Sequence, residues 1–460
     1  MLNSQYISLR LCALAGFWLW CGHFSTTLAS TAVDSTVWGP SGGQVDIGFR
    51  GHAATWSTPR MTLHVDPWMC IRHVGGTPQR NDEAGFDEPW DNLRGAAFHG
   101  ELDGVWTITG SLEEYQGIPT AWERHWMGEG RSLPGWGRMK PTSGGRVDVA
   151  RGRSRTTGRF VLPNPKDTLV VSLAYDAAHW GNDLAPLALD SRSAPYPHGS
   201  LGISIGKYFN VTAASALLSG EERWWAPQWT ATNLGFASRM YRRTGVQWTQ
   251  CEVKPNKRLV SALLFGRHRD RPWLQESDST AQFQWSYWSS FLGTMQSTNG
   301  ANRWTAEWVP NVARALSWSS KHGAWRGTLT LARVQTQAAS AVLPRHAGTP
   351  LGAPLLPLWS DETTWETSAV WRSEGAVTWT HQRMRTGVHV LSLADQWWFE
   401  AWGAWTLQSE WPLHLTAGLE TWRLEGSLNM PSEGLRWRVG VSHTLVMSPG
   451  RPTFAPPCSP

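Results

Sequence analysis

Residues 397–407 read Trp-Trp-Phe-Glu-Ala-Trp-Gly-Ala-Trp-Thr-Leu, and this stretch decides the fold class. Trp397, Phe399 and Trp405 fall on one face, whereas Glu400 and Thr406 fall on the other. A period of two predicts a β-strand, because successive side chains of a strand point to opposite faces. Strands of about 9–11 residues can cross a bilayer when tilted, whereas globular strands run about 5–6 residues. The stretch therefore favours a transmembrane β-barrel over a soluble β-sandwich.

Other parts of the chain repeat this alternation. The further runs are residues 313–319, 325–333, 363–372, 376–384, 413–420 and 435–442. Turns are expected between paired runs, at residues 321–323 and at Ser373-Glu374-Gly375. Connections at residues 163–167 and 254–257 are short, whereas the one at residues 336–361 is long. Short turns at one end and long loops at the other are typical of outer-membrane barrels, as are Trp and Tyr near strand ends. No sustained helical stripe occurs, so few helices are expected.

The composition agrees with a membrane barrel. Of 460 residues 33 are Trp, and only 17% are charged, against roughly 25% in a typical soluble domain. A disordered chain would lack the aromatic residues, and a helical membrane protein would need several apolar runs of about 20 residues. Both classes are excluded.

The first 30 residues are predicted to be a secretory signal peptide. Arg10 supplies the positive charge, and residues 11–20 form an apolar stretch too short to span a bilayer. Cleavage is expected after Ala29, with Ala32 as the alternative site; an uncleaved membrane anchor is the competing interpretation. Residues 31–100 are weakly patterned and could form first strands, a plug or a strand-poor periplasmic segment. Residues 101–447 are assigned to the barrel and residues 448–460 to a Pro-rich tail.

Cysteines and charge give no sign of a metal or nucleic-acid site. After signal removal, Cys70, Cys251 and Cys458 remain, far apart and without a Cys-x-x-Cys partner, so one disulfide is open and a metal site is not suggested. The 15 His show no metal-binding pair. Arg and Lys are scattered rather than clustered, so nucleic acid is not an expected partner. No cofactor is expected.

Residues 102–271 carry a resemblance to a known family. The matching pieces, in order, are Gly110 to Gly117, Leu133-Pro134-Gly135-Trp136-Gly137-Arg138, Val147 to Gly152, the hairpin through Pro163 to Lys166, Tyr175 to Asp183, Leu187 to Asp190, Ala194 to Pro197, and the hairpin around Asn256-Lys257-Arg258. This order resembles the Wzi-like capsule-assembly family in its Bacteroidota form, which includes outer-membrane proteins linked to gliding motility.

The resemblance implies an outer-membrane barrel of about 16–18 strands associated with surface polysaccharide or surface motility components. Outer-membrane lipid, surface polysaccharide and envelope proteins are the partners it implies. The chain departs from the family where a Gly-Tyr-Arg-Ser element is replaced by Asp183-Leu184-Ala185-Pro186, and where Ser-Asp-Asn becomes Asp190-Ser191-Arg192. A shared role of that loop is thereby in doubt.

Two groups of residues are candidates for binding glycan. The first lies in the signature segment and comprises Tyr175, His179, Trp180 and Asp190; the second is a polar-aromatic cluster with Arg223, Trp224, Trp225, Arg242 and Arg243. Trp rings can stack on sugars, and Arg can pair with acidic sugars or phosphates. For the second group, an interfacial girdle with flanking cations is the favoured interpretation over glycan binding. His179 and Trp180 could instead form a tight loop that packs the barrel mouth.

Enzymatic activity is not expected. Gly202-Ile203-Ser204-Ile205-Gly206 matches the nucleophile-elbow pattern, but it lies within an alternating strand rather than a sharp strand-to-helix turn. Glu113 and Glu114 are adjacent on a predicted strand, so their side chains should face opposite sides, with one of them in the lumen. Two carboxylates on opposite faces cannot act together as acid and base on one bond.

Two alternative functions are compatible with these sequence features. The first is a non-enzymatic Wzi-like barrel that assembles or attaches surface polysaccharide, or serves surface motility, with its lumen blocked by long side chains. The alternative is a porin for small solutes, since barrels of about 16–18 strands can leave an aqueous channel.

Overall fold

The protein is a closed antiparallel barrel of 18 strands in the computed structural model. The structure describes residues 35–38, 44–47, 53–76, 90–121, 123, 132–133, 136–138, 140–141, 146–181, 186–189, 193–219, 243–270, 285–335, 345–346, 349–350, 369–393, 396–407, 413–424 and 433–444. The predicted all-β, up-and-down class is confirmed. The 18 strands lie within the predicted range. The predicted signal peptide (residues 1–30) and the predicted Pro-rich tail (residues 448–460) lie outside the described residues.

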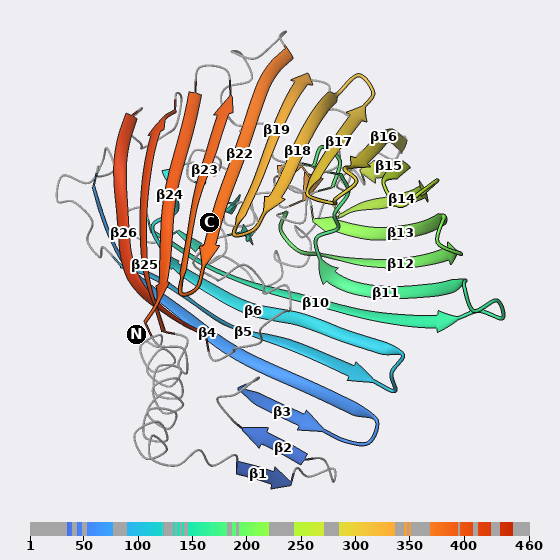
Figure 1. The fold of residues 1–460 in the computed structure, drawn as a ribbon, viewed down its shortest axis with the longest axis horizontal. Coiled ribbons are helices and arrows are strands. Elements are labelled where there is room, and N and C mark those ends of the chain that lie inside the picture. The colour runs from blue at the N-terminus through green and yellow to red at the C-terminus, as the bar shows by residue number, and fades with distance from the viewer. Residues whose placement is uncertain are drawn as a thin grey trace, which may run out of the picture.

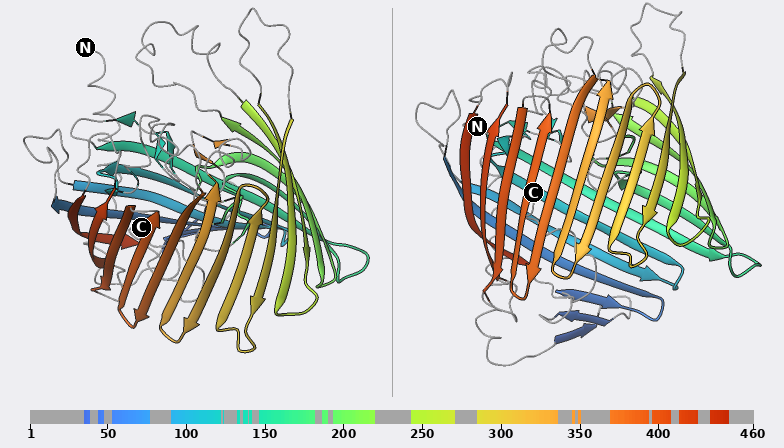
Figure 2. Two further views of the ribbon diagram at one scale, coloured as in Figure 1. Left: turned by 90° about the horizontal axis from the view of Figure 1, so that it is seen from above. Right: turned by 45° about the horizontal axis from the view of Figure 1, so that its top comes forward.

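The barrel strands follow one another around the ring in chain order (Figures 1 and 2). They are β4 (Met61–Gly76), β5 (Trp90–Leu102), β6 (Trp106–Gly117), β10 (Val147–Val161), β11 (Thr168–Asp176), β12 (Tyr196–Ile205), β13 (Phe209–Ser219), β14 (Arg243–Val253), β15 (Leu259–Asp270), β16 (Trp285–Gln296), β17 (Asn302–Val309), β18 (Ala313–His322), β19 (Trp325–Gln335), β22 (Ala369–His381), β23 (Met384–Leu393), β24 (Gln396–Thr406), β25 (Leu413–Arg423) and β26 (Glu433–Thr444). Five two-residue strands lie in the connections: β7 (Ser132–Leu133), β8 (Gly137–Arg138), β9 (Lys140–Pro141), β20 (Arg345–His346) and β21 (Thr349–Pro350).

The barrel closes between β4 and β26, and β4 divides its edge between two neighbours. Its second half, from Trp68 onward, pairs with β26, whereas residues 62–65 pair with β3 (Ala54–Ser57). Pro67 lies between the two pairings, where the edge needs no N–H donor, which explains how a proline fits inside this strand. β3 continues into β2 (Gln44–Ile47) and β1 (Ser35–Trp38), a short sheet beyond β4 at the lower edge of Figure 1.

The described part of residues 31–100 therefore contributes the strands β1 to β5. Two of these strands, β4 and β5, belong to the barrel, which begins at Met61 rather than at residue 101. The prediction of a turn at Ser373-Glu374-Gly375 is wrong, because β22 runs straight through these residues. The turn to β23 lies at residues 382–383. The polar side chain that suggested a turn, Glu374, instead points into the barrel.

The two faces of the wall differ as the alternation predicts. Leu316, Leu331 and Trp405 are among many large apolar side chains exposed on the outside, with 58%, 47% and 54% of their surface accessible. The inward side chains of the same strands are buried and often polar. An exposed apolar belt of this extent is the surface that a bilayer requires. Short turns and long connections also alternate along most of the chain, so that the long connections lie at one end of the barrel. We refer to this end as extracellular.

Tryptophan rings repeatedly cover glycines on the neighbouring strand. The pairs directly opposite in register are Gly75–Trp437, Gly95–Trp68, Gly158–Trp106, Gly266–Trp288, Gly387–Trp402 and Gly434–Trp422. At each glycine an added Cβ would lie within 3.0 Å of the ring, closer than real Cβ contacts allow. Such aromatic–glycine pairs protect the backbone and fix strand register.

Candidate functional site in the barrel lumen

The lumen holds two connection segments that enter from the extracellular end. We call residues 118–121 and 123, which follow β6, the Ile118 segment, and residues 177–181 and 186–189, which follow β11, the Trp180 segment. Each is held by hydrogen bonds from its backbone to inward side chains of distant strands. Both therefore lie against the inner face of the wall, near the extracellular ends of the strands that hold them.

The Ile118 segment is fixed by two buried carboxylates. The Ile118 N–H donates to Asp91 Oδ1 at 2.8 Å, and the Ala121 N–H donates to Glu420 Oε2 at 3.1 Å. Two guanidinium groups hold its carbonyls: Arg436 donates to Pro119 O at 2.8 Å and Arg438 to Ile118 O at 3.2 Å. The inward faces of β5, β25 and β26 thus supply donors and acceptors for a backbone that would otherwise be buried without partners.

The same charges neutralise one another across the wall. Glu420 Oε1 lies 3.0 Å from Arg436 and 3.2 Å from Arg438, and Arg438 reaches Asp91 Oδ2 at 3.3 Å. Arg72 reaches the same Asp91 oxygen at 3.1 Å. Asp91, Glu420, Arg436 and Arg438 are each at most 5% exposed, so this is a buried ion network rather than a set of surface pairs. A buried charge requires such partners.

Apolar packing completes this side of the lumen. Ala121 packs in a buried cluster with Leu391, Trp398, Trp422 and Leu424. The Trp398 indole N–H donates to Glu420 Oε2 at 3.1 Å, so the ring is anchored by the carboxylate that also holds Ala121. The segment is therefore fixed by both polar and apolar contacts.

A capping box shapes the end of the Ile118 segment. The Glu123 N–H donates to Thr120 Oγ1 at 3.1 Å, while the Thr120 N–H and hydroxyl donate to Glu123 Oε2 at 2.8 and 2.9 Å. This reciprocal pairing starts a helical turn. Glu123 lies in the connection, outside the strands, and burial raises the pKa of its carboxyl, although the Thr120 hydrogen bonds act in the opposite direction.

The Trp180 segment is held by Glu307 of β17, six strands away from Glu420 of β25 around the ring. The Leu187 N–H donates to Glu307 Oε2 at 2.9 Å and the Ala188 N–H to Oε1 at 3.2 Å. Ser290 bridges the two parts, because its hydroxyl donates to Glu307 Oε1 at 3.2 Å and accepts the Trp180 indole N–H at 3.1 Å. Trp180 is 6% exposed and packs in the largest apolar cluster of the interior.

Arginines line the inner face of β10. Arg151 forms a 2.6 Å ion pair with Glu113, and its guanidinium lies 4.0 Å from the ring centre of Trp136. Arg153 and Arg155 face Asp176 at 3.5 and 3.2 Å. An arginine stacked on a tryptophan beside a carboxylate is an arrangement that suits an acidic sugar, through ring stacking and charge-assisted hydrogen bonds.

The structure does not bring the predicted glycan-binding residues together. Trp180 is buried in the lumen and its neighbour His179 is exposed, whereas Tyr175 lies on the outer face of β11, 47% exposed. Arg243 is the first residue of β14. Asp190, Arg223, Trp224, Trp225 and Arg242 lie outside the described residues. Within the described part, only His179 and Trp180 belong to one segment.

The residues that organise the lumen were largely missed by motif reading. Glu307, Asp91 and Glu420 show no motif, and their contacts join residues far apart in sequence. A local signal did exist in two places: Arg436 and Arg438 alternate with apolar residues in a predicted strand, and Thr120 and Glu123 have capping-box spacing.

The enzyme-like patterns have structural explanations. Ser204 lies within β12 with Ile203 and Ile205 exposed on the opposite face, as the alternation predicted. Glu113 faces the lumen, whereas Glu114 lies on the outer face and pairs with Arg94 at 2.8 Å.

Two cysteines lie in described strands, Cys70 in β4 and Cys251 in β14. Cys70 takes part in a disulfide, and Cys251 is a free thiol. No group of three or more potential ligand side chains that could hold a metal ion occurs in the part of the chain that the structure describes. Nor does any described helix have the length and apolar character to span a membrane.

Comparison with known proteins gives structural likenesses only. No protein-family model and no curated sequence matches the chain. Wzi from Escherichia coli, described as a carbohydrate-binding barrel involved in group 1 capsule assembly, is 11% identical, with a TM-score of 0.47 over 82% of this chain and 84% of that one. OccK9 (OpdG) from Pseudomonas aeruginosa is 12% identical, with a TM-score of 0.42 over 83% and 98%. OpdK from the same organism is 10% identical, with a TM-score of 0.39 over 83% and 98%.

At these scores the likenesses do not bear on function, and the fold class rests on the geometry of this chain. The strand count, the closure between β4 and β26, the apolar exterior and the unequal ends all agree. The protein is a transmembrane β-barrel whose lumen contains two fixed connection segments.

Proposed function

We propose that this protein is a non-enzymatic outer-membrane barrel that retains or assembles surface polysaccharide at its extracellular end. The proposal includes export by a signal peptide cleaved near Ala29, and lipid, polysaccharide and envelope proteins as partners. It follows the resemblance of residues 102–271 to Wzi-like proteins. The same resemblance also implies an association with surface motility components, which is the second possibility to be tested.

The observation that carries the proposal is the occupied lumen. Barrels of 16–18 strands are wide enough for an aqueous channel. Here the Ile118 and Trp180 segments lie inside the wall and are held by Glu420 of β25 and Glu307 of β17, which are six strands apart around the ring. Because their backbone amides are bonded to buried carboxylates, moving either segment would break these hydrogen bonds and leave buried N–H groups without an acceptor. Such a lumen favours a binding protein over an open diffusion pore.

The chemistry near the extracellular end suits a glycan with acidic groups. Trp136 presents a ring beside Arg151, and Tyr115 lies 5.8 Å from that ring, centre to centre. His179 is exposed next to the buried Trp180. Aromatic faces stack on the apolar faces of sugars, and arginine forks bind carboxylates.

The test is a deletion strain complemented with the wild-type chain or with an Arg151→Gln/Trp136→Ala double variant. We expect deletion to reduce cell-retained polysaccharide or surface spreading, wild type to restore it, and the double variant to restore it incompletely. Arg94→Gln, on the outer face of the neighbouring wall, is the matched control and should restore it fully. Normal polysaccharide retention and normal spreading in the deletion strain would contradict the proposal.

A porin is the second candidate, and the arginines on β10 favour it. Arg153 and Arg155 face the lumen and could guide anions through any remaining opening. Single-channel recordings in planar bilayers separate the candidates. Stable, anion-selective openings of the wild-type protein would support the porin, and a silent barrel supports the occluded binding protein.

A further inference from the structure

The lipid-facing surface carries an isolated pair of arginines near the extracellular end. Arg314 is the second residue of β18, and Arg333 lies two residues before the end of β19. They are direct cross-strand partners, and both are exposed on the outer face. Leu316 and Leu331, the next outward pair, are exposed apolar residues, so the two cations border the membrane belt.

This placement is unfavourable for the fold alone. Like charges directly opposite each other in a sheet are destabilising, and a lipid-facing arginine costs about 2–4 kcal/mol at midplane, falling to about 0–1 near the interfaces. Among the described outward positions of β16–β19 and β22, no carboxylate occurs and these arginines are the only charged side chains. Among the outward side chains that the structure describes on these strands, the pair therefore has no counter-charge.

Aromatic residues flank the pair in register. Trp308 of β17 is opposite Arg314, and Trp371 of β22 is opposite Arg333. Both rings are more than half exposed, at 53% and 54%. Beyond Trp308 the row continues with Phe291, whose ring stacks on Trp308 at 5.3 Å between centres. Amphipathic rings beside cations are typical of the depth at which lipid headgroups lie.

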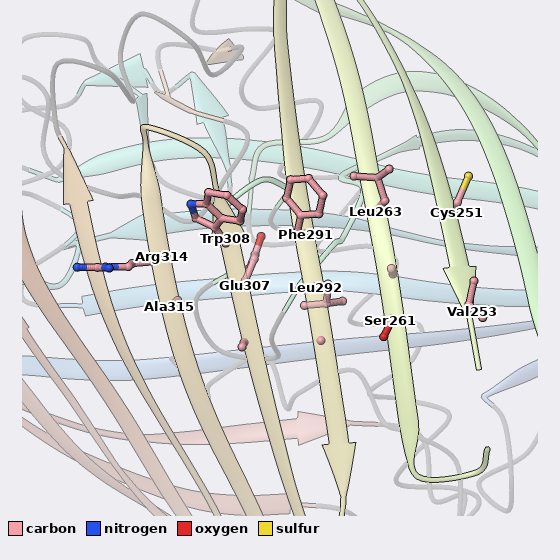
Figure 3. A pocket seen from close by; sticks show the side chains of 13 residues that line it. Cys251, Val253, Ser261, Leu263, Phe291, Leu292, Glu307, Trp308, Arg314 and Ala315 are labelled. Carbon is pink, nitrogen blue, oxygen red and sulfur yellow. The ribbon is translucent and has the colours of Figure 1, made fainter. Parts of the chain in front are cut away.

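A groove of about 720 Å³ begins at Arg314 and runs over the outer face of β14–β18. Figure 3 shows Arg314, Trp308, Phe291, Leu263 and Cys251 in one row across neighbouring strands. Small outward residues, Gly293 and Ala306 among them, form part of its lining. No atom lies within 4 Å of the position that a Cβ on Gly293 would take, so the wall is indented there.

We propose that Arg314 and Arg333 bind a phosphate group of a multiply acylated glycolipid of the outer leaflet, with one acyl chain lying in this groove. Guanidinium forks bind phosphate oxygens through paired hydrogen bonds, and an anion between them removes the repulsion of the two arginines. The apolar lining accepts hydrocarbon, and the flanking rings lie where the sugar part would sit. This site is on the opposite face of the wall from the lumen and does not depend on the proposed glycan function.

The test uses the full-length barrel purified in detergent and titrated with hexa-acylated, bisphosphorylated lipid A, with bound lipid counted by native mass spectrometry. We expect the wild type to retain this lipid and Arg314→Gln/Arg333→Gln to bind it about tenfold more weakly, which is 1.4 kcal/mol. Arg326→Gln, on the lumen face of the same β19, is the matched control and should bind normally. A heat-dependent mobility shift on gels confirms that each variant is folded.

A second variant and two further lipids keep the proposal open to refutation. Gly293→Leu, which fills the groove and leaves the arginines intact, should also weaken binding. Dephosphorylated lipid A and phosphatidylglycerol should bind more weakly than bisphosphorylated lipid A. Equal binding by the double arginine variant, equal binding of either comparison lipid, or no retention by the wild type would each overturn the proposal.

Discussion

The Ala121 N–H donates a 3.1 Å hydrogen bond to Glu420 Oε2, and this bond joins residues 299 positions apart. The same carboxylate is in contact with Arg436, Arg438 and Trp398. One side chain of β25 thus fixes a connection that leaves the barrel wall after β6, and it balances two buried cations at the same time.

Glu420→Gln is therefore expected to destabilise the barrel strongly. It leaves Arg436 and Arg438 short of a counter-charge in a buried site, and breaking a buried pair costs about 3–5 kcal/mol. Equilibrium unfolding in lipid vesicles measures the change. The control is Glu433→Gln, since Glu433 pairs with Arg423 at 3.4 Å with both side chains more than half exposed, and such pairs contribute about 0–1 kcal/mol. Equal effects of the two substitutions would contradict a special role for Glu420.

Glu307→Ala should loosen the Trp180 segment without dismantling the wall. It removes the acceptor of the Leu187 and Ala188 amides and leaves the strand pairing of β17 intact. We expect transient conductance steps in planar bilayers that the wild type lacks. Glu101→Ala, at an exposed position near the short-turn end of β5, should behave as wild type. A silent Glu307→Ala barrel would show that the segment does not depend on this carboxylate.

Gly266→Ala tests the tryptophan–glycine pairs. The added methyl group would overlap the ring of Trp288, so the ring or the strand must move. Overpacking of this kind costs typically about 1–3 kcal/mol. Gly245→Ala in the adjacent β14 is the matched control, because no atom lies within 4 Å of its Cβ position. The prediction is a lower unfolding midpoint for Gly266→Ala and a midpoint near that of wild type for Gly245→Ala; the reverse order would be inconsistent with it.

The half-buried carboxyl of Glu123 predicts a pH dependence. Because its folded-state pKa is raised above the ordinary value, its contribution to stability is fully present below that value and is lost as the pH rises through the folded-state pKa. Glu123→Gln should flatten this loss. Limited proteolysis of the Ile118 segment between pH 4 and pH 8 measures it, with Glu433→Gln as an exposed control that keeps the wild-type slope. An unchanged slope in Glu123→Gln would exclude this residue as the source.

The strand pattern was predictable because the bilayer imposes it locally. In residues 435–442 every second side chain is apolar and faces outward, so the strand and both of its faces follow from the sequence. In β4 the alternation is interrupted by Pro67 and by Asp66, whose carboxylate accepts the Ala53 N–H at 3.0 Å. The divided edge that accommodates these residues depends on β26, at the other end of the chain.

The contacts inside the lumen were less predictable, because they join residues that are far apart in the sequence. Glu307 and Leu187 are 120 positions apart, and only closure of the ring brings them together. Polar residues that face the lumen can also have the composition of a turn. Ser373-Glu374-Gly375 is such a case, since Glu374 is buried in the interior and paired with Arg372 and His389. Local sequence patterns show which residues face inward, and ring closure determines which of them meet.

The tryptophan–glycine pairs change how the composition of this chain should be understood. Its 33 Trp and 45 Gly look like two separate excesses. In the wall they are partly one feature, since each covered glycine leaves the space that a ring fills. Neither member can be replaced alone without creating a clash or a gap. In related chains the two positions should therefore change together, so that strand register is inherited as pairs of residues rather than as single ones.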